Sequence, residues 1–461
     1  MRRIMYISTG IWLCVSCSAG EDYARPEFYT DATLARTLNV SAQKPLPQKW
    51  YIDFADSQLT ALIEKGLQNS TDIKMAVARI KQARAQLQIT KVGALPQINA
   101  QTGYNYEKQS KNIGMAANSH YYTAGFDASW ELDLWGKNRR QIEAGRADLK
   151  AAKYTLENVR LTVAAEIAAN YFNLLENAEN LRLAEKNALL QQEIFSTVKS
   201  KYDSGLTDET AYSEALYLLE NTKAQIPAYR AAVEQYRNAL ATIIGVLPSE
   251  ISIETTAAKQ LSAAPSGQKQ NLTEFPANAV RARPDVAAAE QNLIAENALV
   301  GAAVAELYPN VGISGLWGYA AQGGSKLIRS SSQTYNYAPL ISLPLLDWNR
   351  LQNNVRLQKY IKVEALENYK QSLLNAVAEI RDAQTAYDEA IKSAQSQYRA
   401  LVNMRNAVNL MQTKYQNGLI EFSDIVTSQQ NLIAAERAYT AIRAQILQKK
   451  IAFYKAVGAP L

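Results

Sequence analysis

The chain has 461 residues, of which 48% are hydrophobic and 20% are charged, and its formal net charge is +6. This charge is too small for a chain of this length to indicate binding to nucleic acid. The hydrophobic residues are scattered, and no stretch is long and apolar enough to predict a membrane-spanning helix. A nucleic-acid-binding protein and a helical membrane protein are therefore excluded.

The first residues have the pattern of an export signal. Arg2 and Arg3 precede a short apolar run, so residues 1–16 are predicted to be a signal peptide. The end of this run resembles a bacterial lipobox with Cys17 as the lipid-accepting residue, which implies the outer membrane; the alternative is cleavage after Ala19 and an unmodified chain. No cysteine follows Cys17, so we expect no disulfide in the mature chain.

One long segment occurs twice in the chain. Leu95-Pro96 returns as Tyr308-Pro309, and Gly205 returns as Gly418, with the same difference in residue number, which we call the repeat period. This period is far longer than that of solenoid repeats, so each copy is predicted to be a large unit with several elements. The predicted divisions are a lipid-anchored segment at 17–52, a first repeat at 53–247, a linker at 248–275 and a second repeat at 276–461.

Two segments in each repeat alternate between apolar and polar residues, with the period of a β-strand. They predict strands at about 96–107, 121–135, 310–322 and 334–347. One face is rich in aromatic residues, and the other is polar or small and carries Asp127, Glu131 and Asp133. A soluble sandwich also has such strands, but the aromatic residues near the strand ends and the export signal favour a transmembrane barrel. We then expect the three acidic residues to face its lumen.

A long helical hairpin is predicted after each pair of strands. Residues 137–203 contain no proline and only one glycine, and a helix of that length would be about 100 Å long at roughly 1.5 Å per residue. The hairpins are predicted at 137–245 and 350–457. Pro227, whose counterpart in the second repeat is Thr440, is either a hinge or a tolerated kink.

Four strands cannot close a barrel by themselves. An open sheet edge in hydrocarbon leaves unpaired amides, which cost several kcal/mol each, so the chain must form an oligomer. Two chains would give eight strands and an interior filled by side chains, whereas three chains would give twelve strands and a lumen. The pattern therefore predicts an α+β membrane protein: at least a trimeric barrel with four strands per chain, in which a long helical hairpin follows each pair of strands.

Three short motifs accompany this order of elements. They are Trp130–Gly136, Arg283–Asp285 and the paired turns Tyr202–Leu206 and Tyr415–Leu419. With them, the chain resembles the TolC-like outer membrane factors over nearly its whole mature length, specifically the NodT/OprM-like lipoprotein branch that serves resistance-nodulation-division (RND) efflux pumps. The resemblance implies a lipid-anchored homotrimer in the cell outer membrane, in contact with its lipids. Its 12-stranded barrel would continue into a long α-helical, coiled-coil barrel that extends into the periplasm.

The resemblance also implies a function and partners. The chain would be the outer-membrane exit duct of a three-component pump that exports drugs or other small toxic compounds. Its partners would be a periplasmic adapter (membrane fusion) protein and an inner-membrane RND transporter. Two alternatives remain open: an outer-membrane duct of a type I protein secretion system, and a periplasmic structural coiled-coil lipoprotein.

Candidate site residues lie at the two hairpin turns. From the residues alone, the turns either contact a partner or simply need glycine; the resemblance favours adapter contact through Tyr202, Gly205, Leu206, Tyr415, Gly418 and Leu419. The resemblance implies a role in the gate for Asp424, which matches a family position whose three carboxylates narrow the closed pore; the alternative is an ordinary solvated acid. Other family closing residues are replaced here, so we expect Asp208, Glu209 and Glu421 to contribute to the gate.

The sequence contains no recognisable catalytic pattern. Its only histidine, His120, lies between two predicted strands, and no group of His, Cys or acidic residues has metal-binding spacing. Nucleophilic triads and phosphate-binding loops are also absent from the sequence. We therefore expect neither enzyme activity nor a cofactor or metal.

Overall fold

The computed structural model describes residues 18–38, 48–108, 110, 112, 118–262, 275–276 and 278–461. The predicted signal peptide at 1–16, Cys17 and residues 263–274 of the predicted linker lie outside the described residues. The chain divides into two compact units. Unit 1 comprises Met1–Glu27, Ala78–Tyr154 and Ala287–Gln371, and unit 2 comprises Phe28–Val77, Thr155–Val286 and Ser372–Leu461.

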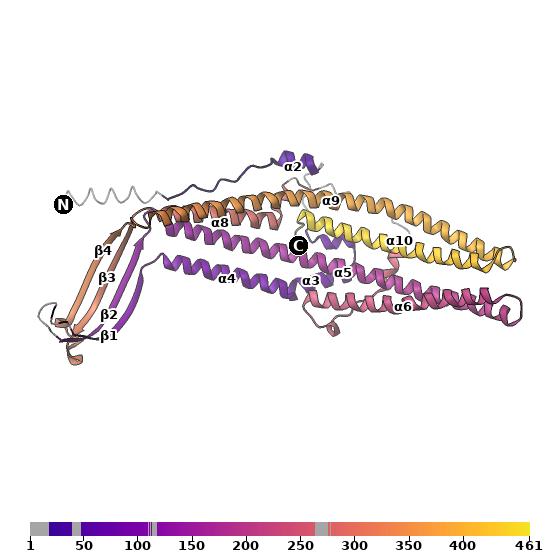
Figure 1. The fold of residues 1–461 in the computed structure, drawn as a ribbon, viewed down its shortest axis with the longest axis horizontal. Helices are drawn as coiled ribbons and strands as arrows, with labels where there is room; N and C mark the ends of the chain where they lie inside the picture. The colour runs from indigo at the N-terminus through magenta and orange to yellow at the C-terminus, as the bar shows by residue number, and fades with distance from the viewer. Residues whose placement is uncertain are drawn as a thin grey trace. The chain divides into compact units, whose positions relative to one another are not determined.

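Unit 1 contains an antiparallel sheet of four strands in the order β1–β2–β3–β4 (Figure 1). The pairing register is the same in both repeats: Gln97 lies opposite Ser129, and Asn310, which follows Gln97 by one repeat period, lies opposite Ser342. The strands are β1 (Gln97–Lys108), β2 (Asn118–Leu132), β3 (Asn310–Ala321) and β4 (Gln333–Ser342), with short 3-10 helices η5 (Gly324–Lys326) and η6 (Ser330–Ser332) between β3 and β4.

The alternating sequence gives the sheet two different faces. On one face Phe126 lies opposite Trp317, and their stacked rings are 6.4 Å apart between centroids. On the other face the Asn99 amide donates a hydrogen bond of 3.1 Å to the Asp127 carboxylate. Because successive strand residues point to opposite sides, the aromatic residues are separated from the polar ones along every strand.

Two strands end earlier than the alternating pattern predicts. β2 ends at Leu132, because the next residue, Asp133, accepts hydrogen bonds of 3.0 Å from the backbone amides of Asn138 and Arg139. A carboxylate in this place satisfies amides in the first turn of a helix that would otherwise have no partner. β4 is an edge strand of this sheet and contains Pro339 opposite Ile313 of β3. It ends at Ser342, two residues before Pro344.

The longest elements are helices that continue from the sheet strands. α5 (Lys137–Asp203) has 67 residues and α9 (Trp348–Gln416) has 69, so each is about 100 Å long. Each forms a hairpin with the next helix, α6 (Glu209–Ile244) or α10 (Phe422–Val457), and Figure 1 shows both turns. Two further helices, α4 (Thr71–Gly93) and α8 (Pro284–Ala305), precede β1 and β3. None of the described helices is long and apolar enough to cross a membrane.

An extended segment at the start of the described chain is bound to the helices of unit 1. Arg140 of α5, which is almost completely buried, donates to the Ala19 carbonyl at 3.2 Å and to the Asp22 carboxylate at 2.8 Å. Further along, Arg25 forms a two-pronged ion pair of 2.6 and 2.9 Å with Glu290 of α8. Paired contacts of this kind fix both position and direction, so the segment at 18–27 follows one defined path.

The 3-10 helix η1 (Trp50–Phe54) of unit 2 packs on α10. Trp50 is fully buried and stacks on Tyr454 with 5.5 Å between ring centroids, and the Tyr454 hydroxyl donates to Asp53 at 2.5 Å. Lys450 donates to the Asp53 carbonyl at 3.0 Å, and burial lowers the pKa of its ammonium group. The other short elements of unit 2 are α2 (Asp31–Leu38), α3 (Ser57–Asn69), η3 (Pro248–Glu250), η4 (Thr256–Ser262) and α7 (Ala279–Ala282).

Arg283 joins three parts of unit 2. Its guanidinium donates to both carboxylate oxygens of Asp285 at 3.0 and 2.7 Å, to Glu379 of α9 at 2.7 Å, and to the Ala456 carbonyl of α10 at 2.6 Å. Only 7% of the Arg283 side chain is exposed. The planar guanidinium satisfies all these acceptors at once and secures the C-terminal end of α10.

Candidate functional site at the hairpin turns

The two hairpin turns have the same backbone geometry. Gly205 and Gly418 both have a φ angle of +71°, which is accessible to glycine at little cost. In the first turn the Leu206 amide donates to the Lys201 carbonyl at 2.8 Å, and in the second the Leu419 amide donates to the Lys414 carbonyl at 2.9 Å. These are the bonds of the Schellman motif, which ends a helix by satisfying its last carbonyls.

Each turn presents a leucine to its surroundings. Leu206 is 75% exposed and Leu419 is 70% exposed, and a Cβ added to either turn glycine would meet no atom within 4 Å. The glycines are therefore required for backbone conformation and not for close packing. Of the two predicted contact tyrosines, Tyr202 is exposed, whereas Tyr415 is half-buried and its pKa is raised by that burial.

An apolar cluster joins the two hairpins beneath their turns. Phe422 and Ile425 of α10 pack with Val198 of α5 and with Ala211 and Leu218 of α6. All of these side chains are less than 9% exposed. Such clusters are held by the removal of apolar surface from water, which depends little on charge. We define the buried members as the apolar clasp: Val198, Ala211, Ala215, Leu218, Phe422, Ile425 and Val426.

Aromatic contacts extend the apolar clasp to the turns. Tyr415 lies on Phe422 with 5.5 Å between ring centroids, and the Lys201 ammonium lies 4.9 Å from the centre of the Tyr415 ring. An ammonium at this distance is attracted to the face of an aromatic ring. Tyr415 therefore links the end of α5 to the start of α10, while Tyr202 packs against Tyr212 of its own hairpin at 5.1 Å.

The four acidic residues predicted for the gate have different environments. Asp208 caps α6, because its carboxylate accepts a hydrogen bond of 2.9 Å from the Ala211 amide. Glu421 occupies the equivalent position before α10 but forms no side-chain capping bond. Glu209 and Asp424 lie in the first turns of the two helices, and both are exposed. Their part in a gate stays a prediction.

The acidic residues predicted to face a lumen are divided between a strand and a helix start. Asp127 and Glu131 lie on the polar face of β2, opposite Leu316 and Gly312 of β3. Asp133 lies beyond the strand, where it caps α5 and forms an ion pair of 3.3 Å with Arg139. Within β2 every second residue lies on the polar face. This alternation ends before Asp133, because Asp133 caps the first turn of α5.

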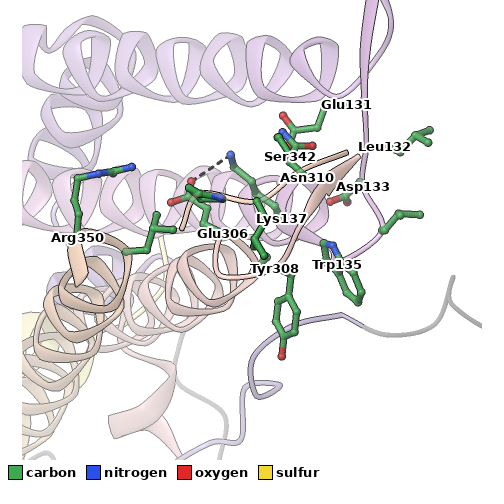
Figure 2. A pocket seen from close by; sticks show the side chains of 15 residues that line it. Glu131, Leu132, Asp133, Trp135, Lys137, Glu306, Tyr308, Asn310, Ser342 and Arg350 are labelled. Carbon is green, nitrogen blue, oxygen red and sulfur yellow. Dashed lines mark ion pairs between the residues drawn. The ribbon is translucent and has the colours of Figure 1, made fainter. Parts of the chain in front are cut away.

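A cavity of about 430 Å³ lies where β2 joins α5, and Figure 2 shows the side chains that line it. Lys137 and Glu306 form an ion pair of 3.2 Å in its wall. Nearby, Trp135 stacks on Tyr308 with 4.8 Å between ring centroids and donates to the Pro309 carbonyl at 2.8 Å. The motif around Trp135 thus fixes the junction between strand and helix. Across the described residues, no group of three or more His, Cys, Asp or Glu side chains is placed to hold a metal ion.

Pro227 lies inside α6, which continues through it from Glu209 to Ile244. Its counterpart Thr440 is fully buried in α10 and donates to the Glu436 carbonyl at 3.0 Å. The proline removes one helical hydrogen bond that the second repeat retains. The two hairpins therefore differ in local backbone bonding at equivalent positions.

Comparison with known proteins assigns these features to a family. The family described as outer membrane efflux protein matches residues 62–246 and 276–459. The chain is similar to the cation efflux system protein CusC of Escherichia coli O6:H1 (25% identical; 96% of this chain and 95% of CusC). It is also similar to the probable outer membrane lipoprotein SilC of Salmonella typhimurium (25% identical; 99% and 98%). The solved outer-membrane channel OprN has a TM-score of 0.87 (28% identical; 96% of this chain and 99% of OprN).

Proposed function

The chain belongs to the outer membrane efflux protein family, which makes it an outer-membrane efflux channel, and we propose that it is the exit duct of a three-component RND pump. The resemblance to TolC-like outer membrane factors and the fold class predicted from the sequence are confirmed by the same comparisons. The observation that carries the proposal is the duplicated plan. The two pairs of strands have the same pairing register, and each pair leads into a long helical hairpin.

The sheet supports a homotrimer. Its edge strands β1 and β4 are exposed along almost their whole length, and their outer amides and carbonyls have no partner strand within the described chain. In a membrane these groups need partners, and three chains are the smallest number that closes a sheet of this kind around a lumen. The aromatic face would then contact outer-membrane lipids, and the polar face of β2 would line the duct.

The hairpin turns are the proposed contact with the periplasmic adapter. Leu206 and Leu419 project from backbone turns that leave them largely exposed, and a partner would cover them. A partner that covered these leucines would remove apolar surface from water, which favours association. Because the transporter and adapter select the cargo in this proposal, the duct itself passes drugs or other small toxic compounds without catalysing a reaction.

Deletion of the gene tests the proposed function. In a host strain without a redundant duct, deletion is expected to increase accumulation of dyes and drugs, and the wild-type gene is expected to restore export. Unchanged accumulation of every compound tested would contradict the proposal. The purified protein provides an independent measurement: it should conduct ions in planar bilayers, which a structural coiled-coil lipoprotein would not do.

Replacement of Gly418 by proline should uncouple the adapter while leaving the assembled channel intact. Proline cannot adopt a φ of +71°, and it lacks the amide that donates to the Tyr415 carbonyl at 3.0 Å. We expect drug resistance to fall to the level of the deletion strain, with a normal amount of trimer in the outer membrane.

Gly418→Ala is the matched control. It keeps the amide and meets no neighbouring atom, so only the backbone strain of about 1 kcal/mol remains and the loss of resistance should be smaller. Gly205→Pro and Gly205→Ala repeat the comparison in the first turn. Wild-type resistance in both proline variants would show that the turns do not bind the adapter.

A further inference from the structure

Pro227 is the one proline in the four hairpin helices α5, α6, α9 and α10, all of whose residues the structure describes. Because proline has no amide hydrogen, it donates no bond to the Lys223 carbonyl, and its ring crowds the preceding turn. α6 nevertheless continues through this position as a helix. A helix weakened in this way is stiffened by any contact that holds both sides of the proline.

Arg437 of α10 contacts α6 on both sides of Pro227. Its guanidinium donates a hydrogen bond of 3.2 Å to the side-chain carbonyl of Gln225, two residues before the proline. It also lies 5.5 Å from the centre of the Tyr229 ring, two residues after the proline, where a cation is attracted to the face of the ring. We call these two contacts together the Arg437 bridge.

The Arg437 bridge reaches one turn further through Gln225. The Gln225 side-chain amide donates to the Asn221 carbonyl at 3.4 Å, while its oxygen accepts the hydrogen bond from Arg437. The connected groups extend from Asn221 to Tyr229, which is about two turns of helix around Pro227. A side chain of the second hairpin therefore supports the turns of the first hairpin that the proline weakens.

The residue before Arg437 fixes α10 at the same level. Glu436 is 7% exposed and accepts hydrogen bonds from Arg405 of α9 at 3.0 Å and from Asn187 of α5 at 3.4 Å. A buried carboxylate is stable only with such donors, so the position of α10 is well defined here. Glu436 and Arg437 also line one small cavity between the two hairpins. α10 thus contacts α5 through Glu436 and α6 through Arg437.

The second repeat has neither the proline nor the bridge. One repeat period after Pro227 the chain has Thr440, and one repeat period before Arg437 it has Ala224. Thr440 has an amide for its helix, and the methyl group of Ala224 cannot reach a neighbouring hairpin. An arginine that only packed the hairpins together would be useful in both repeats. The bridging arginine occurs where the proline occurs, which ties its role to the proline.

We propose that the Arg437 bridge stiffens α6 at Pro227 while the second hairpin lies against the first, and that it breaks when the second hairpin moves away. The apolar clasp joins the same two hairpins between this level and the turns. When the apolar clasp opens, the bridge is lost and the end of the first hairpin becomes free to bend at Pro227. This inference rests on the proposed duct and adds an order of events to its opening.

Hydrogen exchange of the purified full-length protein, followed by mass spectrometry, tests the bridge. In Arg437→Ala the α6 amides around Pro227 should exchange about tenfold faster than in the wild type, because a hydrogen bond and a ring contact are lost together. Arg437→Lys keeps the charge but cannot make both contacts with one planar group, so its increase should be smaller. Arg230→Ala is the matched control, since its ion pair with Glu185 stays within the first hairpin, and it should change exchange little.

The decisive comparison removes the proline. Pro227→Ala restores the missing amide, so α6 no longer needs support from the second hairpin. Adding Arg437→Ala to Pro227→Ala should therefore leave exchange in α6 unchanged. An increase of the same size with and without the proline would overturn the proposal, because Arg437 would then only pack the hairpins. Equal exchange in the wild type and in Arg437→Ala would overturn it as well.

Phe422→Ala tests whether the apolar clasp controls the bridge. The substitution weakens the apolar clasp and leaves both Arg437 and Pro227 in place. Exchange around Pro227 should rise in Phe422→Ala but not in the double variant with Pro227→Ala. Unchanged exchange in Phe422→Ala channels of raised conductance would overturn the order of events and leave the duct standing. A protein with the expected exchange differences that conducts no ions in planar bilayers would refute the duct instead.

Discussion

The Phe422→Ala variant is expected to form channels that open without a partner. Phe422 is 5% exposed in the apolar clasp, and replacing a buried phenylalanine with alanine typically costs about 3–5 kcal/mol. If the hairpins separate when the duct opens, this cost falls mainly on the closed state. A change of about 3 kcal/mol would raise the ratio of open to closed channels roughly a hundredfold.

Conductance of the purified protein in planar bilayers measures this effect. Wild-type channels should spend most of the time in a low-conductance state, and Phe422→Ala channels in a high-conductance state. Leu419→Ala is the matched control, because Leu419 is exposed and lies outside the apolar clasp. A folded Phe422→Ala trimer with wild-type conductance would show that the apolar clasp does not hold the tip closed.

Arg283→Ala should lower the thermal stability of the protein more than substitutions at exposed arginines. The change leaves the Ala456 carbonyl without its donor and two carboxylates without their shared cation. Breaking a buried ion pair typically costs about 3–5 kcal/mol, and because Asp285 and Glu379 are partly exposed, we expect about 2–3 kcal/mol.

Thermal unfolding followed by circular dichroism tests this expectation. Arg283→Lys should have an intermediate midpoint, because lysine keeps the charge but cannot donate to several acceptors in one plane. Arg230→Ala is a control at an exposed ion pair with Glu185 and should change the midpoint little. Equal midpoints for Arg283→Ala and Arg230→Ala would mean that the Arg283 network does not stabilise unit 2.

The fold was largely predictable because its signals are local and long. Alternation over ten or more residues indicates a strand, and 67 residues without proline indicate a helix, whatever the tertiary structure. The ends of strands were less predictable. Asp133 continues the alternating pattern, but its carboxylate is used by the first turn of α5, and that depends on where the helix begins.

The site was only partly predictable. The turn glycines were identifiable because a Schellman motif needs a residue with positive φ. The apolar clasp was not identified, since its members come from α5, α6 and α10, and helical spacing does not reveal which faces meet. The motif Arg283-Pro284-Asp285 was visible in the sequence, but the role of Arg283 depends on Glu379 and Ala456, which are far away along the chain. Adapter contact and the acidic gate stay predictions.

The two turns share a backbone but not their neighbouring side chains. Gly205 is followed by Leu206 and Thr207, whereas Gly418 is followed by Leu419 and Ile420. In the proposed homotrimer, a ring of six turns would contain two chemically different sets of three, arranged alternately. An adapter that contacts only the shared leucine could bind at all six turns. An adapter that also contacts the residue after the leucine would bind at three of them. The number of adapters bound per trimer would therefore show which residues they recognise.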